Sequence, residues 1–168
     1  MPFITGNLEI HVGPPALGSP DNLESVIIDF ISKARKELLI AVQELESVPI
    51  AEEIINAAKR GIRVRLILER NYLTLTKRPP DPWVETGENE ENRRILNALR
   101  RAKVDVMSDL NPETFHQKFI VRDPDHVKAA VLTGSTNFTP TGVTSNLNHI
   151  VILHSKRIAT LYLDEFIE

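Results

Sequence analysis

Strand-like and helix-like segments alternate along the first part of the chain, from position 8 to position 69. Segments 8–12, 37–43 and 62–69 have the apolar or alternating patterns typical of strands, whereas 22–36 and 48–60 carry apolar residues at helical spacing. Strands joined through helices usually pair in parallel within one sheet, because the helix returns the chain to the same edge. This rhythm predicts an α/β fold with helices packed against a sheet.

The second half of the chain predicts an antiparallel addition to this sheet. Two apolar runs flank a polar turn that contains a proline, which is typical of a hairpin. The expected elements are a helix at 89–102, strands at 103–108, 116–123, 127–135 and 149–154, and a helix from Ser155. We therefore predict a mixed, largely parallel-plus-hairpin β-sheet flanked by helices on both faces, in a single domain covering residues 1–168.

Length and composition narrow the class of protein. The chain has 168 residues, 42% of them hydrophobic and 26% charged, which is typical of one soluble globular domain. No apolar run approaches the ~20 residues that span a bilayer, and the first residues lack the features of a signal peptide. The absence of cysteine excludes disulfides, thiolate metal sites and a cysteine nucleophile. We expect a cytoplasmic protein without a membrane anchor.

His116 and Lys118 stand two residues apart in the run TFHQKFIVRD, which is otherwise largely apolar and ends at Asp123. Because side chains alternate across a strand, His116 and Lys118 share one face, at the polar start of the strand. Lysine supplies a positive charge and three donors, and histidine acts as base, acid or nucleophile near neutral pH. The pair therefore suits an oxyanion, phosphate above all.

The segment TGSTNFT, residues 133–139, supplies a second set of polar groups. Gly134 permits a close approach of the backbone to a ligand, and Ser135 and Asn137 place a hydroxyl and an amide on one face. Small polar donors with backbone N–H groups form anion-binding concavities. Because the strand at 127–135 pairs with the strand of His116, we expect the two sets to converge on one phosphate pocket.

Taken singly, each of these features has a common structural explanation: a surface histidine, a turn at 134–137 and a hairpin cap at Asp123. Their joint spacing favours a site. The His-Lys-Asp motif of the phospholipase D superfamily resembles the pattern His116-x-Lys118-x4-Asp123 followed by Gly134-Ser135-x-Asn137. The segment NFTPTGVTSNLNHIVIL and the order of strands and helices are also similar to that superfamily, especially its nuclease-like branch.

This resemblance implies a metal-independent phosphodiesterase that needs no cofactor. One histidine is expected to attack phosphorus and form a phosphohistidine, and a second histidine to protonate the leaving oxygen. On this basis His116 is nucleophile or acid, Lys118 and Asn137 bind phosphoryl oxygens, and Asp123 orders the site. Gly134 and Ser135 would complete the wall of the phosphate pocket.

The chain departs from the resembled family at two places. Residues 124–133 form a longer connection between the aspartate and the glycine than is usual, which fits a longer hairpin turn. Asn148 stands where the family often has a carboxylate that holds the nucleophilic histidine. An amide oxygen can accept the imidazole N–H but adds no negative charge, so a slow or inactive enzyme is an alternative.

The implied chemistry needs two histidine–lysine pairs, and the chain has one. The other histidines lack the full pattern downstream: His11, His126, His149 and His154. Short members of the resembled family form a two-fold dimer that places two motifs across the interface, and long members carry two copies in one chain. The sequence therefore predicts a homodimer with a shared site, with one half of a longer protein as the alternative.

Three functions follow from this motif. The first is a nuclease acting on DNA or RNA, with Arg93, Arg94, Arg100 and Arg101 as candidates for backbone contacts. The net charge of −3 gives no general attraction to nucleic acid, so a local basic patch would be needed. The second is a nucleic-acid-binding module with little or no turnover. The third is a phospholipid phosphodiesterase or transferase, which would need an apolar surface facing the membrane.

Overall fold

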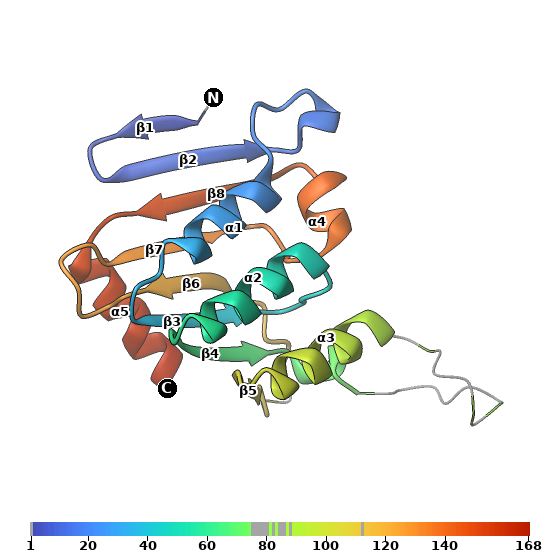
Figure 1. Cartoon of the computed structure of the whole chain (residues 1–168). Helices are drawn as coiled ribbons and strands as arrows, with labels where there is room; N and C mark the ends of the chain where they lie inside the picture. The colour runs from blue at the N-terminus through green and yellow to red at the C-terminus, as the bar shows by residue number, and fades with distance from the viewer. Residues whose placement is uncertain (1, 75–80, 82, 84–86, 88, 112) are drawn as a thin grey trace.

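The computed structural model describes residues 2–74, 81, 83, 87, 89–111 and 113–168. Within them, the strands are β1 (Phe3–Thr5), β2 (Leu8–Gly13), β3 (Glu37–Val42), β4 (Arg63–Leu68), β5 (Asp105–Ser108), β6 (Lys118–Arg122), β7 (Ala130–Gly134) and β8 (Asn148–Leu153). They form one sheet in the order β1-β2-β8-β7-β6-β3-β4-β5 (Figure 1). The predicted mixed sheet is confirmed.

The sheet is parallel on one side and antiparallel on the other. Strand β4 pairs in parallel with both β3 and β5, through crossovers that contain α2 (Val48–Lys59) and α3 (Glu90–Arg101). Strands β6 and β7 form the expected hairpin, and the remaining pairs are also antiparallel. The alternation of strands and helices early in the chain did not show that β8, β7 and β6 lie between β2 and β3.

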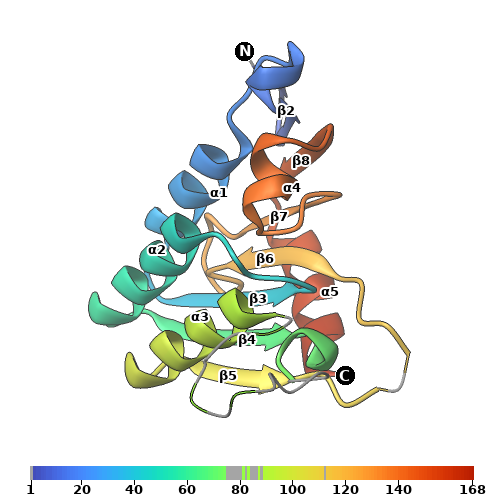
Figure 2. The same cartoon turned by 90° about the vertical axis from the view of Figure 1, so that its right-hand side faces the viewer.

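Helices cover both faces of the sheet, as predicted. The helices α1 (Leu23–Ser32), α2, α3 and the short α4 (Pro140–Thr144) lie over one face, and α5 (Lys156–Ile167) lies over the other (Figure 2). Strand β3 is buried on both faces, because Ile40 and Val42 point into the first core, whereas Leu39 and Ala41 pack toward α5. No helix in the described ranges is long and apolar enough to cross a bilayer.

Helix boundaries follow local capping chemistry. Ser47 caps α2 by accepting a hydrogen bond from the Ile50 N–H, and Ser155 caps α5 in the same way from the Ile158 N–H. Helix α4 lies between the strands predicted at 127–135 and 149–154, where no helix was predicted, because five residues containing proline and glycine carry no helical periodicity. Two 3-10 turns, η1 (Pro15–Leu17) and η2 (Arg70–Tyr72), follow β2 and β4.

Asp123, which was predicted to order the site, lies at the opposite end of β6 from Lys118 and can act on the site only through the strand. The length of the strand separates the two, or roughly 16 Å. The buried Asp123 carboxylate accepts hydrogen bonds from three successive backbone N–H groups, those of residues 35–37, at 2.7–3.2 Å. It therefore ties the end of β6 to the start of β3.

We predict that Asp123→Ala lowers the free energy of unfolding by about 3 kcal/mol, because three N–H groups at the entry to β3 lose their shared acceptor. Urea denaturation followed by circular dichroism measures this change. The exposed neighbour Asp125 provides the control, and Asp125→Ala should stay within about 0.5 kcal/mol of the parent. Equal stability of the two variants would contradict the assigned role of Asp123.

Candidate active site

The candidate site lies at the edge of the sheet where β3, β4 and β7 end and where β6 and β8 begin. Lys118 is paired with Val42, the last residue of β3, and Gly134 is paired with Ile150 near the start of β8. Ligands of open α/β sheets bind outside the carboxyl ends of the parallel strands. The fold therefore brings the predicted phosphate-binding residues to the edge at which ligands usually bind.

The ammonium group of Lys118 is buried at this edge, with 8% of the residue exposed. It donates to the Gln43 Oε1 at 3.1 Å and to the His116 carbonyl oxygen at 3.2 Å, and both acceptors are neutral. Burial lowers the pKa of Lys118, and the Glu44 carboxylate opposes that shift. Lys118 is therefore a positive charge kept inside the protein beside one carboxylate.

Asn137 is linked to the same carboxylate. Its Nδ2 donates to the Glu44 Oε1 at 3.0 Å, whereas its Oδ1 is buried without a hydrogen-bond partner in the described part of the chain. Backbone bonds hold the segments together, since the Phe138 N–H donates to the Glu44 carbonyl oxygen at 3.2 Å. The expected convergence of Lys118 and Asn137 thus occurs around Glu44.

Gln43 and Tyr72 complete this group. The Gln43 Nε2 donates to the Tyr72 hydroxyl at 3.4 Å, so Gln43 links Tyr72 to Lys118. Burial and the neighbouring Glu44 carboxylate raise the pKa of the Tyr72 hydroxyl. The sequence analysis did not identify Gln43, Glu44 or Tyr72. Polar residues directly after a buried parallel strand, as at 43–44, are a signal for a ligand site.

A second polar group surrounds Ser135. The Ser135 Oγ donates to the Asn148 Oδ1 at 2.8 Å and lies 3.2 Å from the His149 Nδ1. The Asn148 Nδ2 donates to the Gly142 carbonyl oxygen at 2.8 Å. Within one chain, both ends of the Asn148 amide are therefore used locally, and Asn148 does not hold His116 as expected.

His116 lies just before β6, not within it, and its imidazole is exposed. The chain around it is anchored from both sides. The Glu69 Oε2, after β4, accepts from the Phe115 N–H at 2.5 Å, and the Gln117 carbonyl oxygen accepts from the Gln43 N–H at 3.0 Å. These two hydrogen bonds fix the backbone beside an imidazole that makes no hydrogen bond to the described residues.

The family of the chain follows from comparison with known proteins. Residues 27–168 match the family model described as "Cardiolipin synthase, PLD-like domain". The chain belongs to the phospholipase D-like family.

The relatives of this chain are named for different activities. The chain is 28% identical over 148 residues to a phospholipase D of Rickettsia conorii, a match that covers 88% of this chain and 64% of the relative. It is 24% identical over 153 residues to the mitochondrial cardiolipin hydrolase of Homo sapiens, covering 91% and 53%. The chain thus spans less than two thirds of the length of these relatives.

A solved structure supports the fold independently. The phospholipase D family member Nuc from Salmonella typhimurium matches with a TM-score of 0.73 at 21% identity, covering 95% of this chain and 90% of that chain. At this identity the likeness shows the fold alone. The described residues contain no group of three histidine or carboxylate side chains that could hold a metal ion.

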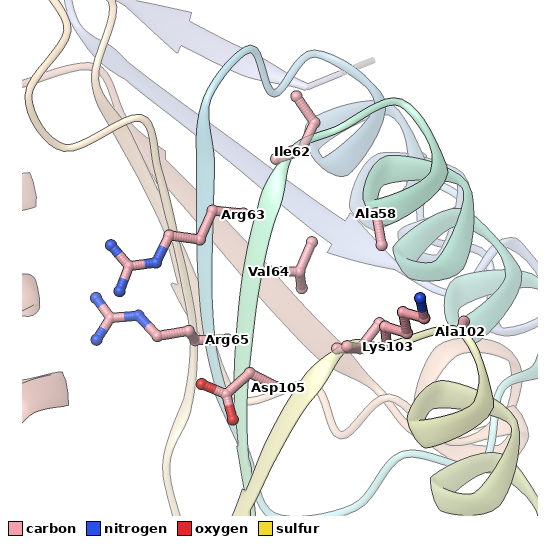
Figure 3. A pocket seen from close by; sticks show the side chains of 9 residues that line it. Ala58, Ile62, Arg63, Val64, Arg65, Ala102, Lys103 and Asp105 are labelled. Atoms are coloured by element: carbon pink, nitrogen blue, oxygen red, sulfur yellow. The ribbon is translucent and has the colours of Figure 1, made fainter.

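A cavity of about 310 Å³ lies at the opposite edge of the sheet from Lys118, around the starts of β4 and β5. Arg63 and Arg65 project from one side of β4, whereas Lys103 lies on the other side, so these cations do not converge (Figure 3). Arg100 and Arg101 end α3 near the same edge, and Arg94 pairs with Glu91. Two of the four arginines expected to contact a nucleic acid, Arg100 and Arg101, therefore lie far from the candidate site.

Gly134 is required by the close approach of β7 to β8. A Cβ atom there would stand 2.2 Å from the His149 carbonyl oxygen, at a φ of +153°. We predict that Gly134→Ala costs about 3 kcal/mol and shifts the backbone around Ser135, because backbone atoms must move apart. Thermal unfolding and amide chemical shifts measure both effects.

Gly18 is the matched control for this substitution. It also has a positive φ, +82°, but a Cβ atom there would meet nothing within 4 Å. Gly18→Ala should therefore cost only about 1 kcal/mol and leave the Ser135 amide shift unchanged. Equal effects at both glycines would contradict a steric requirement at Gly134.

Proposed function

We propose that the chain is a metal-independent phosphodiesterase that acts through a phosphohistidine, with nucleic acid as its substrate. One observation carries the proposal: Lys118 and Asn137, from separate segments, both lie around Glu44 at the carboxyl edge of β3, and the exposed His116 is next to Lys118. A buried cation and an amide donor suit the non-bridging oxygens of a phosphodiester. The exposed imidazole suits attack on phosphorus.

The proposed reaction has two displacements at phosphorus. A neutral His116 ring nitrogen attacks, a P–N bond forms, and the P–O bond to the leaving oxygen breaks as a second histidine gives that oxygen a proton. The second histidine then takes a proton from water, whose oxygen attacks phosphorus while the P–N bond breaks. Lys118 and Asn137 bind the phosphoryl oxygens in both steps.

The second histidine is proposed to be His116 of another copy of the chain. Within the described residues, His149 is the other histidine at this edge, and its Nδ1 lies 3.2 Å from the Ser135 Oγ. A two-fold dimer brings the same exposed segment of both copies together. Several exposed apolar side chains lie along this edge and are available for such an interface: Val12, Leu17 and Leu147.

One observation supports a nucleic acid substrate. His116 lies at an exposed edge, which can accept the backbone of a long polymer. Among the described residues no carboxylate accepts a hydrogen bond from His116, which favours a slow enzyme, and turnover below detection would leave the binding module as the function.

We predict that His116→Ala reduces cleavage of single-stranded or double-stranded nucleic acid by on the order of 10³-fold or more, because the nucleophile and the acid are both lost. Gel assays with EDTA present measure cleavage, which should persist without added metal. His126, in the turn between β6 and β7, is the control, and His126→Ala should cleave at the parental rate. Full activity of His116→Ala would refute the mechanism.

We also predict a homodimer in solution, because one chain supplies one catalytic pair. Sedimentation equilibrium should give about twice the chain mass of 18.9 kDa. Leu147→Asp places a charge among the apolar side chains of the site edge and should shift the population to monomer with loss of cleavage. An active monomer would contradict the shared site.

Hydrolysis of a phospholipid phosphodiester is the second candidate function. The exposed side chains of Val12, Leu17 and Leu147 favour it, because they provide an apolar surface beside the site. Carboxylates also gather at this edge, including Glu44, and they oppose a polyanion. Release of phosphatidic acid from cardiolipin vesicles, without cleavage of nucleic acid, would select this function.

A further inference from the structure

We propose that Glu44 is a positioning residue of the phosphodiesterase site, whose carboxylate orients the Asn137 amide and keeps Lys118 positively charged. The inference rests on the proposed function and adds a residue that the His-Lys-Asp pattern does not contain. Glu44 follows β3, far ahead of Lys118 in the sequence, and touches the site only in the folded chain.

The first effect of Glu44 concerns the amide of Asn137. An amide carries a donor end and an acceptor end, and a half-turn of the amide group exchanges them. A carboxylate only accepts, so the contact at 3.0 Å requires the Asn137 Nδ2 to face Glu44. The rotated amide would set Oδ1 against a negative oxygen. This orientation is kept although it leaves Oδ1 buried and unpaired among the described residues, and it fixes where the second N–H of Nδ2 points.

The second effect concerns the charge of Lys118. A buried ammonium loses the solvation of water, and its two acceptors, Gln43 and the His116 carbonyl group, carry no charge. Burial accordingly lowers the pKa of Lys118, and Glu44 is the carboxylate that counters this effect. Without Glu44, a larger fraction of Lys118 would be neutral and unable to bind a phosphoryl oxygen by charge.

Neighbouring groups restrain Glu44 without replacing it. The Tyr72 hydroxyl lies beside the carboxylate and is linked through Gln43 to Lys118. Other titratable groups stand on the segments around Lys118: Glu69, Tyr72, His116 and His149. Of the charges around Lys118, that of Glu44 raises its pKa.

The backbone of Glu44 can be separated from its side chain by experiment. The main chain at 44–47 pairs with Phe138 through three hydrogen bonds of 2.8–3.2 Å, none of which uses a side chain. A substitution that keeps the size of residue 44 therefore leaves the loop in place. Glu44→Gln removes the charge alone, and Glu44→Asp keeps the charge but shortens the reach to Asn137.

The test compares pH profiles and the titration of Lys118. The mechanism requires both a protonated second histidine and a charged Lys118, so activity falls in two steps as pH rises. The step at higher pH follows the pKa of Lys118 and is the basic limb compared between the variants. Glu44→Gln lowers that pKa, so the basic limb of kcat/KM should move to lower pH by about one unit. Activity on this limb should fall on the order of tenfold. Heteronuclear NMR of the Lys118 ammonium, assigned with Lys118→Arg, should show the same shift without any substrate.

Glu46 provides the matched control, because its carboxylate accepts from the Asn92 Nδ2 at 2.7 Å and belongs to a different contact. Glu46→Gln should keep both the Lys118 titration and the basic limb of the parent. Glu44→Asp should keep the parental titration while kcat falls, since Asn137 loses its acceptor.

Three outcomes separate the claims. An unchanged Lys118 titration in Glu44→Gln overturns the inference, whatever the activity. A shifted titration with an unchanged basic limb overturns the catalytic part of it. If the parent chain cleaves nothing, the proposed function fails, and the Lys118 titration still decides whether Glu44 sets its charge.

Discussion

The carboxylate of Asp123 joins two segments on which the rest of the molecule depends. It accepts hydrogen bonds from successive N–H groups at the entry to β3, far along the chain from its own strand. This clamp supports the antiparallel register of β3 and β6, in which Lys118 pairs with Val42. A slip of one residue would turn every side chain of β6 to the opposite face, so the clamp at one end determines what Lys118 meets at the other.

The candidate site is organised around the ammonium group of Lys118, whose burial costs free energy. An ammonium group leaves water only where acceptors replace its hydration and a countercharge lies near. Gln43 and the His116 carbonyl group supply the acceptors, and Glu44 supplies the countercharge. The same carboxylate binds Asn137, so the two groups expected to hold phosphate are coupled through one residue.

The candidate site is open to solvent at His116. Anchors at Glu69 and Gln43 hold the backbone on both sides of His116, while the imidazole stays exposed and unpaired among the described residues. An exposed imidazole at an open edge is accessible to a large substrate and to a second copy of the chain, as the proposed mechanism requires. Membership of the chain in the phospholipase D-like family over residues 27–168 agrees with this geometry.

The sequence by itself determined the local features of this protein. Apolar periodicity located the long helices and most strands, Ser47 and Ser155 marked helix starts, and the spacing of His116, Lys118 and Asn137 indicated the site. Each of these signals lies within a short stretch of chain, where backbone geometry and capping act. Only the tertiary structure decided the rest. Glu44 lies next to Asn137 because β6, β7 and β8 lie between β2 and β3, an order that no local pattern encodes. The same order places Asp123 beside the entry to β3, and it places Asn148 beside Ser135 instead of His116. These contacts depend on which distant segments become neighbours, and packing of the whole sheet sets that choice.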